Sequence, residues 1–139
     1  MQMLDMSQCY IAVARYAIQS QRQREIDRWQ FHPIEFLKQH RSVHLDLGRC
    51  TYKTVAAIEI AKEHKGIVVA INNASANWMK YQFGYANVIG SKRSIDVIRS
   101  GDFDIVVIDE PACHKPADLD RIYEACAEAK IQNVVMIGR

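Results

Sequence analysis

The sequence predicts a three-layer α/β/α domain built around a small, mostly parallel sheet. The continuous apolar run 67–71 and the strongly apolar segment 103–108 have the composition of strands buried on both faces of such a sheet. Segments with helical periodicity alternate with the strands, which is typical of right-handed βαβ units. The 139 residues suffice for one domain whose core needs no disulfide. We therefore expect a single domain over 1–139, with an N-terminal helical segment over 1–41 and the sheet-bearing core over 42–139.

The first half of the chain is expected to supply three helices and two strands. Apolar residues recur every three or four positions from residue 4, which predicts a helix reaching about residue 28. Pro33 suits the start of a short helix over 34–40. Alternation predicts a strand over 43–47, and helix-forming residues predict a helix over 53–64 that ends before Gly66. The apolar run 67–71 is the second strand.

The second half continues the alternation. We expect a turn at 72–75, a short helix over 77–83 and a short strand over 86–89. A helix over 94–100 closes at Gly101 and is followed by the apolar strand 103–108. An amphipathic helix over 117–130 and a last strand over 133–137 complete the fold.

Composition excludes several classes of protein. The formal net charge is only +2, which does not favour a general nucleic-acid binder. None of the four cysteines forms a CxxC pair, and the five histidines share no metal-ligand spacing, so each is expected at the surface or half-buried. No segment resembles a signal peptide or reaches membrane-spanning length, so we expect reduced thiols and a cytoplasmic location.

A loop between the strand 43–47 and the helix 53–64 has the groups that hold a phosphate. Backbone N–H groups at a helix N-terminus attract anions, and Lys53 adds a cation in the first turn. Thr54 offers a hydroxyl that can ligate magnesium, and glycine at 48 permits a tight turn. The predicted nucleotide-binding residues are Gly48, Arg49, Cys50, Thr51, Tyr52, Lys53 and Thr54.

An acidic pair follows the apolar strand 103–108. Asp109 would lie beside the phosphate loop, where it can hold a magnesium ion. Glu110 could then polarise an attacking water. One βα unit is expected between the loop and this acidic strand, which makes the acidic strand the third of the sheet.

Together these motifs resemble the P-loop NTPases of the additional-strand, catalytic-glutamate class, as found in phage terminase and helicase motors. The resemblance spans about residues 43–139. The pattern GxxxxGK[ST] is met by Lys53 and Thr54, but Leu47 and Tyr52 replace its two glycines. Asn72-Asn73 and Gly138-Arg139 follow apolar strands, as polar turns and sensor residues do in that class.

The resemblance implies specific roles. Lys53 would contact the β- and γ-phosphates of ATP or GTP, and Glu110 would be the general base. Thr54 and Asp109 would hold Mg²⁺, and Arg139 would lie near a sensor position. It further implies a weak or assembly-dependent ATPase, a homo-oligomer or partner subunit that completes the site, and a phage-encoded protein of the host cytoplasm.

Two alternatives remain open from the sequence. Tyr52 could stack on a base or gate the site, or it could mark a catalytically decayed module that binds protein or nucleic acid as a regulator. A basic and aromatic segment could also contact single-stranded nucleic acid, although such a segment is more often a solvated helix with two core aromatics. This segment contains Arg22, Arg24, Arg28, Trp29, Phe31, Lys38 and Arg41.

Overall fold

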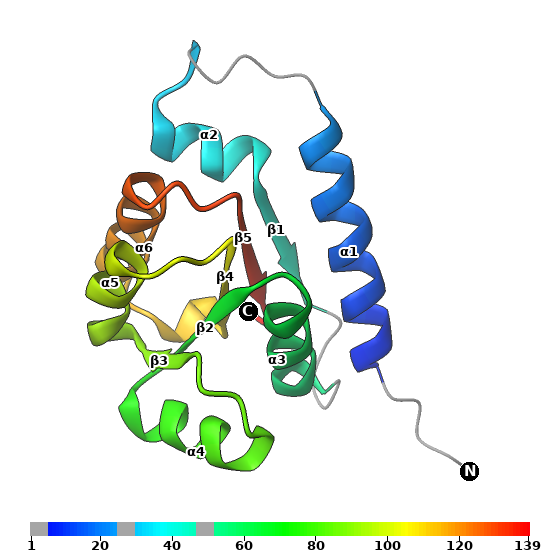
Figure 1. The fold of residues 1–139 in the computed structure, drawn as a ribbon, viewed down its shortest axis with the longest axis vertical. Coiled ribbons are helices and arrows are strands. Elements are labelled where there is room, and N and C mark those ends of the chain that lie inside the picture. The colour runs from blue at the N-terminus through cyan, green and yellow to red at the C-terminus, as the bar shows by residue number, and fades with distance from the viewer. Residues whose placement is uncertain (1–5, 25–29, 47–51) are drawn as a thin grey trace.

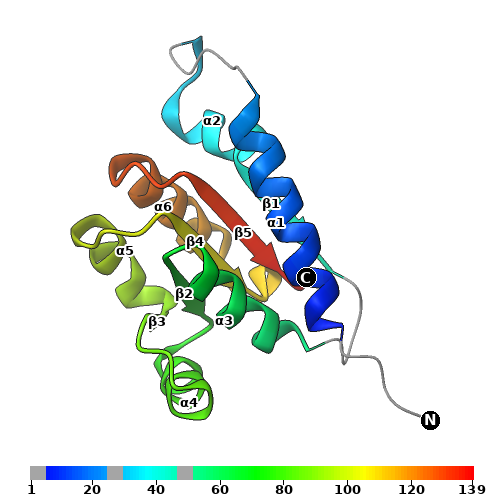
Figure 2. The same cartoon turned by 45° about the vertical axis from the view of Figure 1, so that its right-hand side comes forward.

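The computed structural model describes residues 6–24, 30–46 and 52–139. Within these ranges five strands form one sheet, with all neighbouring strands parallel and in the order β1-β5-β4-β2-β3. The strands are β1 (Ser42–Leu45), β2 (Gly66–Ala70), β3 (Val88–Gly90), β4 (Ile105–Asp109) and β5 (Asn133–Ile137). The last strand therefore lies inside the sheet, between the first strand and β4 (Figures 1 and 2).

Helices cover both faces of this sheet, which confirms the predicted three-layer α/β/α class. One layer contains α1 (Ser7–Gln23), α3 (Lys53–Glu63) and α4 (Asn73–Phe83), and the other contains α2 (Pro33–His40), α5 (Ser91–Ser100) and α6 (Pro116–Glu128) (Figure 1). The short 3₁₀ helix η2 (Pro111–Cys113) follows β4. Because α1 and α2 pack on opposite faces, the N-terminal helical segment contributes to both layers.

Alternating residues of the central strands feed two separate apolar cores. In β4, Ile105 and Val107 face the layer of α1 and α3, whereas Val106 and Ile108 face the layer of α5 and α6. All four side chains are fully buried. Such strands need apolar residues at every position, which explains why continuous apolar runs predicted them.

Several predicted boundaries were wrong for local reasons. Helix α1 ends at Gln23 because Arg24 is extended (ψ 127°), so the predicted extension to residue 28 fails at its first step; residues 25–29 lie outside the described part. Helix α4 begins at Asn73, four residues before the expected start, because the Asn72 side chain accepts a hydrogen bond from the Ser75 N–H at 2.8 Å.

The acidic strand was also misnumbered. The short strand β3 and helix α5 precede it, so Asp109 ends the fourth strand rather than the third. Since β3 lies at the sheet edge beyond β2, it does not separate β4 from β5.

Among the described residues, no helix combines the length and apolarity needed to cross a bilayer.

Candidate functional site

The carboxyl ends of β1, β5 and β4 meet at one edge of the sheet, where backbone contacts join them. The Glu110 N–H donates to the Ile137 carbonyl at 2.8 Å, and the Gly138 N–H donates to the Leu45 carbonyl at 2.9 Å. His44 Nε2 lies 2.7 Å from the Gly138 carbonyl oxygen. This edge is where parallel α/β sheets bind ligands, because the loops there diverge.

Lys53 lies at this edge between two carboxylates. It is the first residue of α3, and its Nζ is 3.4 Å from Asp46 Oδ1 and 3.6 Å from Glu110 Oε1. Its side chain is only 14% exposed. The strand order thus brings together two predicted site residues separated by more than fifty positions, Lys53 and Glu110.

The electrostatics of Lys53 follow from this position. Burial acts to lower the pKa of its ammonium, but the charge of Glu110 and the hydrogen bond and charge of Asp46 together outweigh burial and raise that pKa. Lys53 is therefore firmly cationic. The carboxyl groups of Asp46, Asp109 and Glu110 all act on this ammonium or lie beside it.

Asp109 is the buried member of the cluster, with 8% of its surface exposed. Burial raises the pKa of its carboxyl to about 6; the charge of Glu110 adds to the rise and Lys53 opposes it. Its Oδ1 is buried and has no hydrogen-bond partner among the described residues. Keeping such a carboxylate charged costs stability, which is typical of functional rather than structural positions.

Two backbone positions at the site lie in the left-handed region. Tyr52, immediately before α3, has φ 59° and ψ 38°, and Glu110 has φ 48° and ψ 69°. Residues other than glycine adopt this region at a cost, and functional sites concentrate such strain. Tyr52 occupies the position where the phosphate-loop pattern has glycine, and its side chain is 42% exposed.

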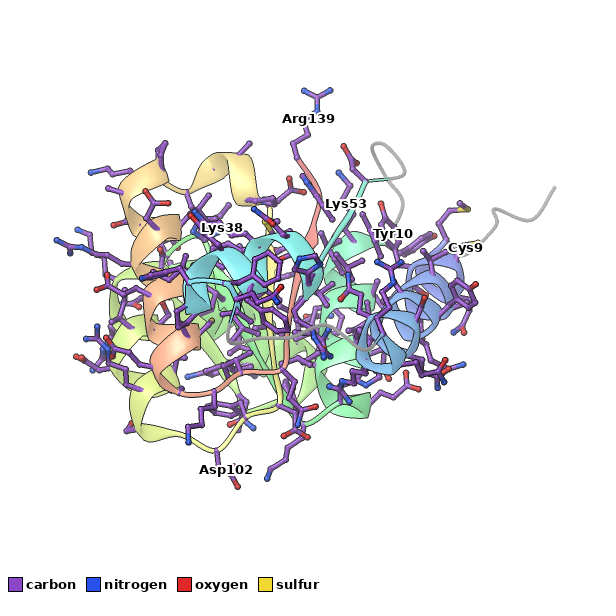
Figure 3. All side chains as sticks on the ribbon, turned by 90° about the horizontal axis from the view of Figure 1, so that it is seen from above. Cys9, Tyr10, Lys38, Lys53, Asp102 and Arg139 are labelled. Atoms are coloured by element: carbon purple, nitrogen blue, oxygen red, sulfur yellow. The ribbon has the colours of Figure 1, made fainter. Side chains whose placement is uncertain are left out.

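The structure describes only some of the other predicted site residues. Thr54 is the second residue of α3 and half-buried, whereas Gly48, Arg49, Cys50 and Thr51 lie outside the described residues. The Arg139 backbone N is 3.4 Å from Glu110 Oε2. Figure 3 shows Lys53 and Arg139 at the same end of the fold, with the Arg139 side chain pointing outward. The sensor role of Arg139 stays a prediction.

Sequence reasoning missed the contacts that three residues make at the site. Asp46, interpreted only as a strand residue, pairs with Lys53. His114, expected at the surface or half-buried, is buried, and its Nε2 lies 2.9 Å from the Asp109 carbonyl oxygen. Gly138 has φ 102° and packs directly against the Glu110 carboxylate. Their positions in the sequence could have indicated them, because all three lie near the carboxyl ends of predicted strands, where parallel sheets bind ligands.

The described residues contain no group of three or more His, Cys, Asp and Glu side chains arranged to hold a metal ion by themselves. The chain matches no protein-family model and no curated protein.

Proposed function

We propose that this chain is a P-loop-type nucleotide-binding domain that hydrolyses ATP or GTP weakly, or only in an assembly that completes its site. One observation carries the proposal: Lys53 in the first turn of α3 lies within ion-pair distance of Glu110, directly after the buried Asp109. A cation at a helix N-terminus, a general base and a magnesium-binding carboxylate are the groups phosphoryl transfer requires.

The strand order sets the loop-bearing strand and the acidic strand near each other without making them neighbours. Here β5 lies between β1 and β4, and its last residues contact both neighbours. This order brings the N-terminus of α3 beside the Asp109–Glu110 pair at one edge of the sheet.

The donor set fits Mg²⁺ bound with a nucleotide. Asp109 offers a buried carboxylate oxygen without a hydrogen-bond partner among the described residues, and Thr54 offers a hydroxyl one residue after Lys53. Magnesium commonly uses one or two protein oxygens and takes its remaining ligands from phosphates and water. When bound, the ion would neutralise charge on the phosphates.

The Lys53–Glu110 ion pair suggests how binding would prepare catalysis. A phosphate chain at the α3 N-terminus would compete with Glu110 for the Lys53 ammonium. As Lys53 turns to the β- and γ-phosphates, the Glu110 carboxylate is released from the ion pair and can turn to the attacking water. Glu110 can then take a proton from the attacking water, so the base is activated only when substrate is present.

A second function is favoured by the same ion pairs. Lys53 already has two carboxylate partners without any ligand, so the cluster is also a self-sufficient structural element. Together with Tyr52 at the glycine position, this arrangement suits a catalytically decayed module that binds a protein or nucleic acid as a regulator. Such a module would show no nucleotide turnover.

Nucleotide titration separates the two functions. We expect the native chain to bind ATP with Mg²⁺, and Lys53→Ala to weaken binding by about 10- to 100-fold because charge-assisted phosphate contacts are lost. Glu110→Gln should keep binding and lower turnover by about 10²- to 10⁴-fold. Calorimetry and phosphate release measure the two effects.

The matched control is Lys62→Ala, since Lys62 is an exposed lysine of the same helix that also pairs with a carboxylate, Glu59. This variant should bind and hydrolyse as the native chain does. Turnover unchanged in Glu110→Gln contradicts the catalytic assignment. Nucleotide binding unchanged in Lys53→Ala contradicts the site itself.

Tyr52→Gly tests the departure from the loop pattern. Glycine adopts the left-handed backbone of position 52 without strain but has more freedom in the unfolded chain, so we expect a stability change within about 1 kcal/mol. If the tyrosine obstructs the phosphates, nucleotide affinity should rise. Urea unfolding and nucleotide titration provide the two readouts, and a loss of affinity would indicate instead that Tyr52 contacts the nucleotide.

A further inference from the structure

The peptide group between Asp109 and Glu110 has a hydrogen-bond partner for its N–H and another for its carbonyl. The N–H, which belongs to Glu110, donates to the Ile137 carbonyl of β5 at 2.8 Å. The carbonyl oxygen, which belongs to Asp109, lies 2.9 Å from Nε2 of His114 in a buried contact. His114 has no part in the hydrolysis described above, yet it contacts the backbone that joins the two acidic residues.

His114 approaches this peptide from the side opposite β5. The described peptide bonds are all trans, so the Asp109 carbonyl points away from the Glu110 N–H and therefore away from β5. That direction leads toward β2, but the pairing of β2 with β4 ends at Val69 and Ile108. The imidazole of His114 thus supplies a hydrogen bond beyond the last described pair of these two strands.

A tight turn brings His114 back to the end of β4. The 3₁₀ helix η2 begins directly after Glu110, whose carbonyl accepts from the Cys113 N–H at 3.0 Å. The His114 N–H donates to the carbonyl of the buried Pro111 at 3.2 Å. His114 is 6% exposed, so the surrounding packing leaves its ring little freedom to turn away from the peptide.

The carbonyl determines which nitrogen of the ring carries the proton in this contact. A carbonyl oxygen can only accept, so Nε2 of His114 is the donor. Nδ1 is also buried and has no hydrogen-bond partner among the described residues. The histidine therefore contributes one directed N–H to the Asp109 carbonyl, and the position of that proton can be measured.

We propose that His114 is a positioning residue, which fixes the Asp109–Glu110 peptide and through it the direction of the Glu110 carboxylate. Glu110 has φ 48° and ψ 69°, a conformation that persists in a non-glycine residue only where the surroundings determine it. Here β5 and His114 hold the peptide before Glu110, and the Cys113 N–H holds the carbonyl after it. The side chain of Glu110 leaves the backbone between these two held peptides.

The inference rests on the proposed function, in which Glu110 takes a proton from the attacking water. A general base works only within hydrogen-bond reach of that proton, and a misplacement of about 1 Å can cost about 10²-fold in rate. Lys53 and the N-terminus of α3 would hold the phosphates without help from His114. Loss of the histidine should therefore lower kcat and leave KM nearly unchanged.

The first measurement uses the full chain without nucleotide. Long-range ¹H–¹⁵N correlation spectra of the native chain should show a proton on Nε2 of His114. His114→Leu keeps an apolar side chain but removes the donor. Relative to the buried amides of β2, hydrogen exchange of the Glu110 amide should become about tenfold faster in this variant. A proton on Nδ1 alone, or unchanged Glu110 exchange, overturns the proposal whatever the turnover.

His114→Gln and Tyr123→Phe are the matched variants. Glutamine has an amide N–H that can replace the Nε2 donor, so it should restore the hydrogen bond. Tyr123→Phe removes the contact between the Tyr123 hydroxyl and Ser42 Oγ, which are 2.8 Å apart. Because Ser42 begins β1, this contact lies at the amino ends of the strands, and its loss measures the effect of a missing hydrogen bond away from the site.

Turnover of ATP with Mg²⁺ is the second measurement, expressed per folded molecule after urea unfolding of each variant. We expect kcat to fall about 10- to 100-fold in His114→Leu, with KM changed by less than about threefold. His114→Gln and Tyr123→Phe should stay within about threefold of the native kcat. Glu110→Gln combined with His114→Leu should be no slower than Glu110→Gln alone, because His114 acts through that carboxylate.

The two measurements separate the two proposals. A native chain without turnover contradicts the proposed function, and the ring proton and the amide exchange then decide whether His114 holds the peptide. An equal loss of kcat in His114→Leu and Tyr123→Phe overturns the positioning role, as does a further loss in the double variant. If His114→Leu does not fold, His114→Met replaces it in both measurements, and the ring proton of the native chain needs no variant.

Discussion

Asp109→Asn is expected to stabilise the fold at about pH 8, by about 1–3 kcal/mol. The native carboxyl has a pKa of about 6, against 3.8 for the ordinary group, because of burial and the neighbouring charge of Glu110. Holding it ionised in the folded chain therefore costs about 3 kcal/mol at most. Asparagine keeps the shape and removes the charge, although its amide must also be accommodated, which lowers the expected gain.

The pH dependence of folding stability tests independently whether the charge of Asp109 destabilises the fold. Between pH 3.8 and about 6, Asp109 remains protonated in the folded chain while it ionises in the unfolded chain. The folded state then binds more protons, so this group makes stability fall as pH rises through that window and level off above it. The difference between the native chain and Asp109→Asn, measured by urea unfolding across the window, isolates this contribution from the other carboxyls.

Magnesium adds a functional readout to the same pair of proteins. If Asp109 holds the ion with a nucleotide, Mg²⁺ and ATP together should stabilise the native chain and leave Asp109→Asn nearly unchanged. If Asp109→Asn is less stable than the native chain at about pH 8, the ionised carboxylate stabilises the fold. Its burial would then no longer support a functional role for Asp109.

Gly138→Ala is expected to disable the base at Glu110. A Cβ at position 138 would lie 2.6 Å from Glu110 Oε2 and 2.9 Å from Oε1, so the carboxylate must move away. The displaced carboxylate would then no longer be placed to meet a water attacking a phosphate at the N-terminus of α3. We expect turnover to fall by about 10²- to 10⁴-fold, close to the effect of Glu110→Gln. The φ of 102° adds a backbone cost of about 1–3 kcal/mol.

Gly84→Ala separates the expected loss of turnover from the expected loss of stability. Gly84 also has a positive φ of 63°, but no atom lies within 4 Å of a Cβ placed there, and it ends α4 away from the site. It should lose stability through backbone strain and keep native turnover per folded molecule. Equal turnover in Gly84→Ala and Gly138→Ala would mean that the Gly138 contact does not position Glu110.

The sheet could be predicted because its central strands are buried on both sides. The apolar run in β4 and the segment Asn133–Ile137 of β5 are unambiguous for that reason. Short elements were less predictable, since their limits depend on single side chains or on tertiary contacts. The Asn72 cap lengthened α4, and the three-residue strand β3 exists through its pairing with β2.

The candidate site could be predicted in its charges but not in its contacts. Lys53, Asp109 and Glu110 stand at positions that the strand and helix pattern places at one sheet edge. The Asp46 ion pair and the close approach of Gly138 to Glu110 depend on how β5 is seated between its neighbours. Since β5 contacts strands distant in the sequence, no local pattern encodes those distances.

The position of β5 also has a consequence for biosynthesis. Synthesis proceeds from the N-terminus, so β1 and β4 emerge from the ribosome before the strand that must be inserted between them. Until Asn133–Ile137 is available, β1 lacks the strand with which it pairs, and nothing yet holds Asp46 at the end of β1 beside Glu110 at the end of β4. The nascent chain should therefore be unable to assemble the Lys53 cluster, and any activity of that cluster would begin only once β5 has been made.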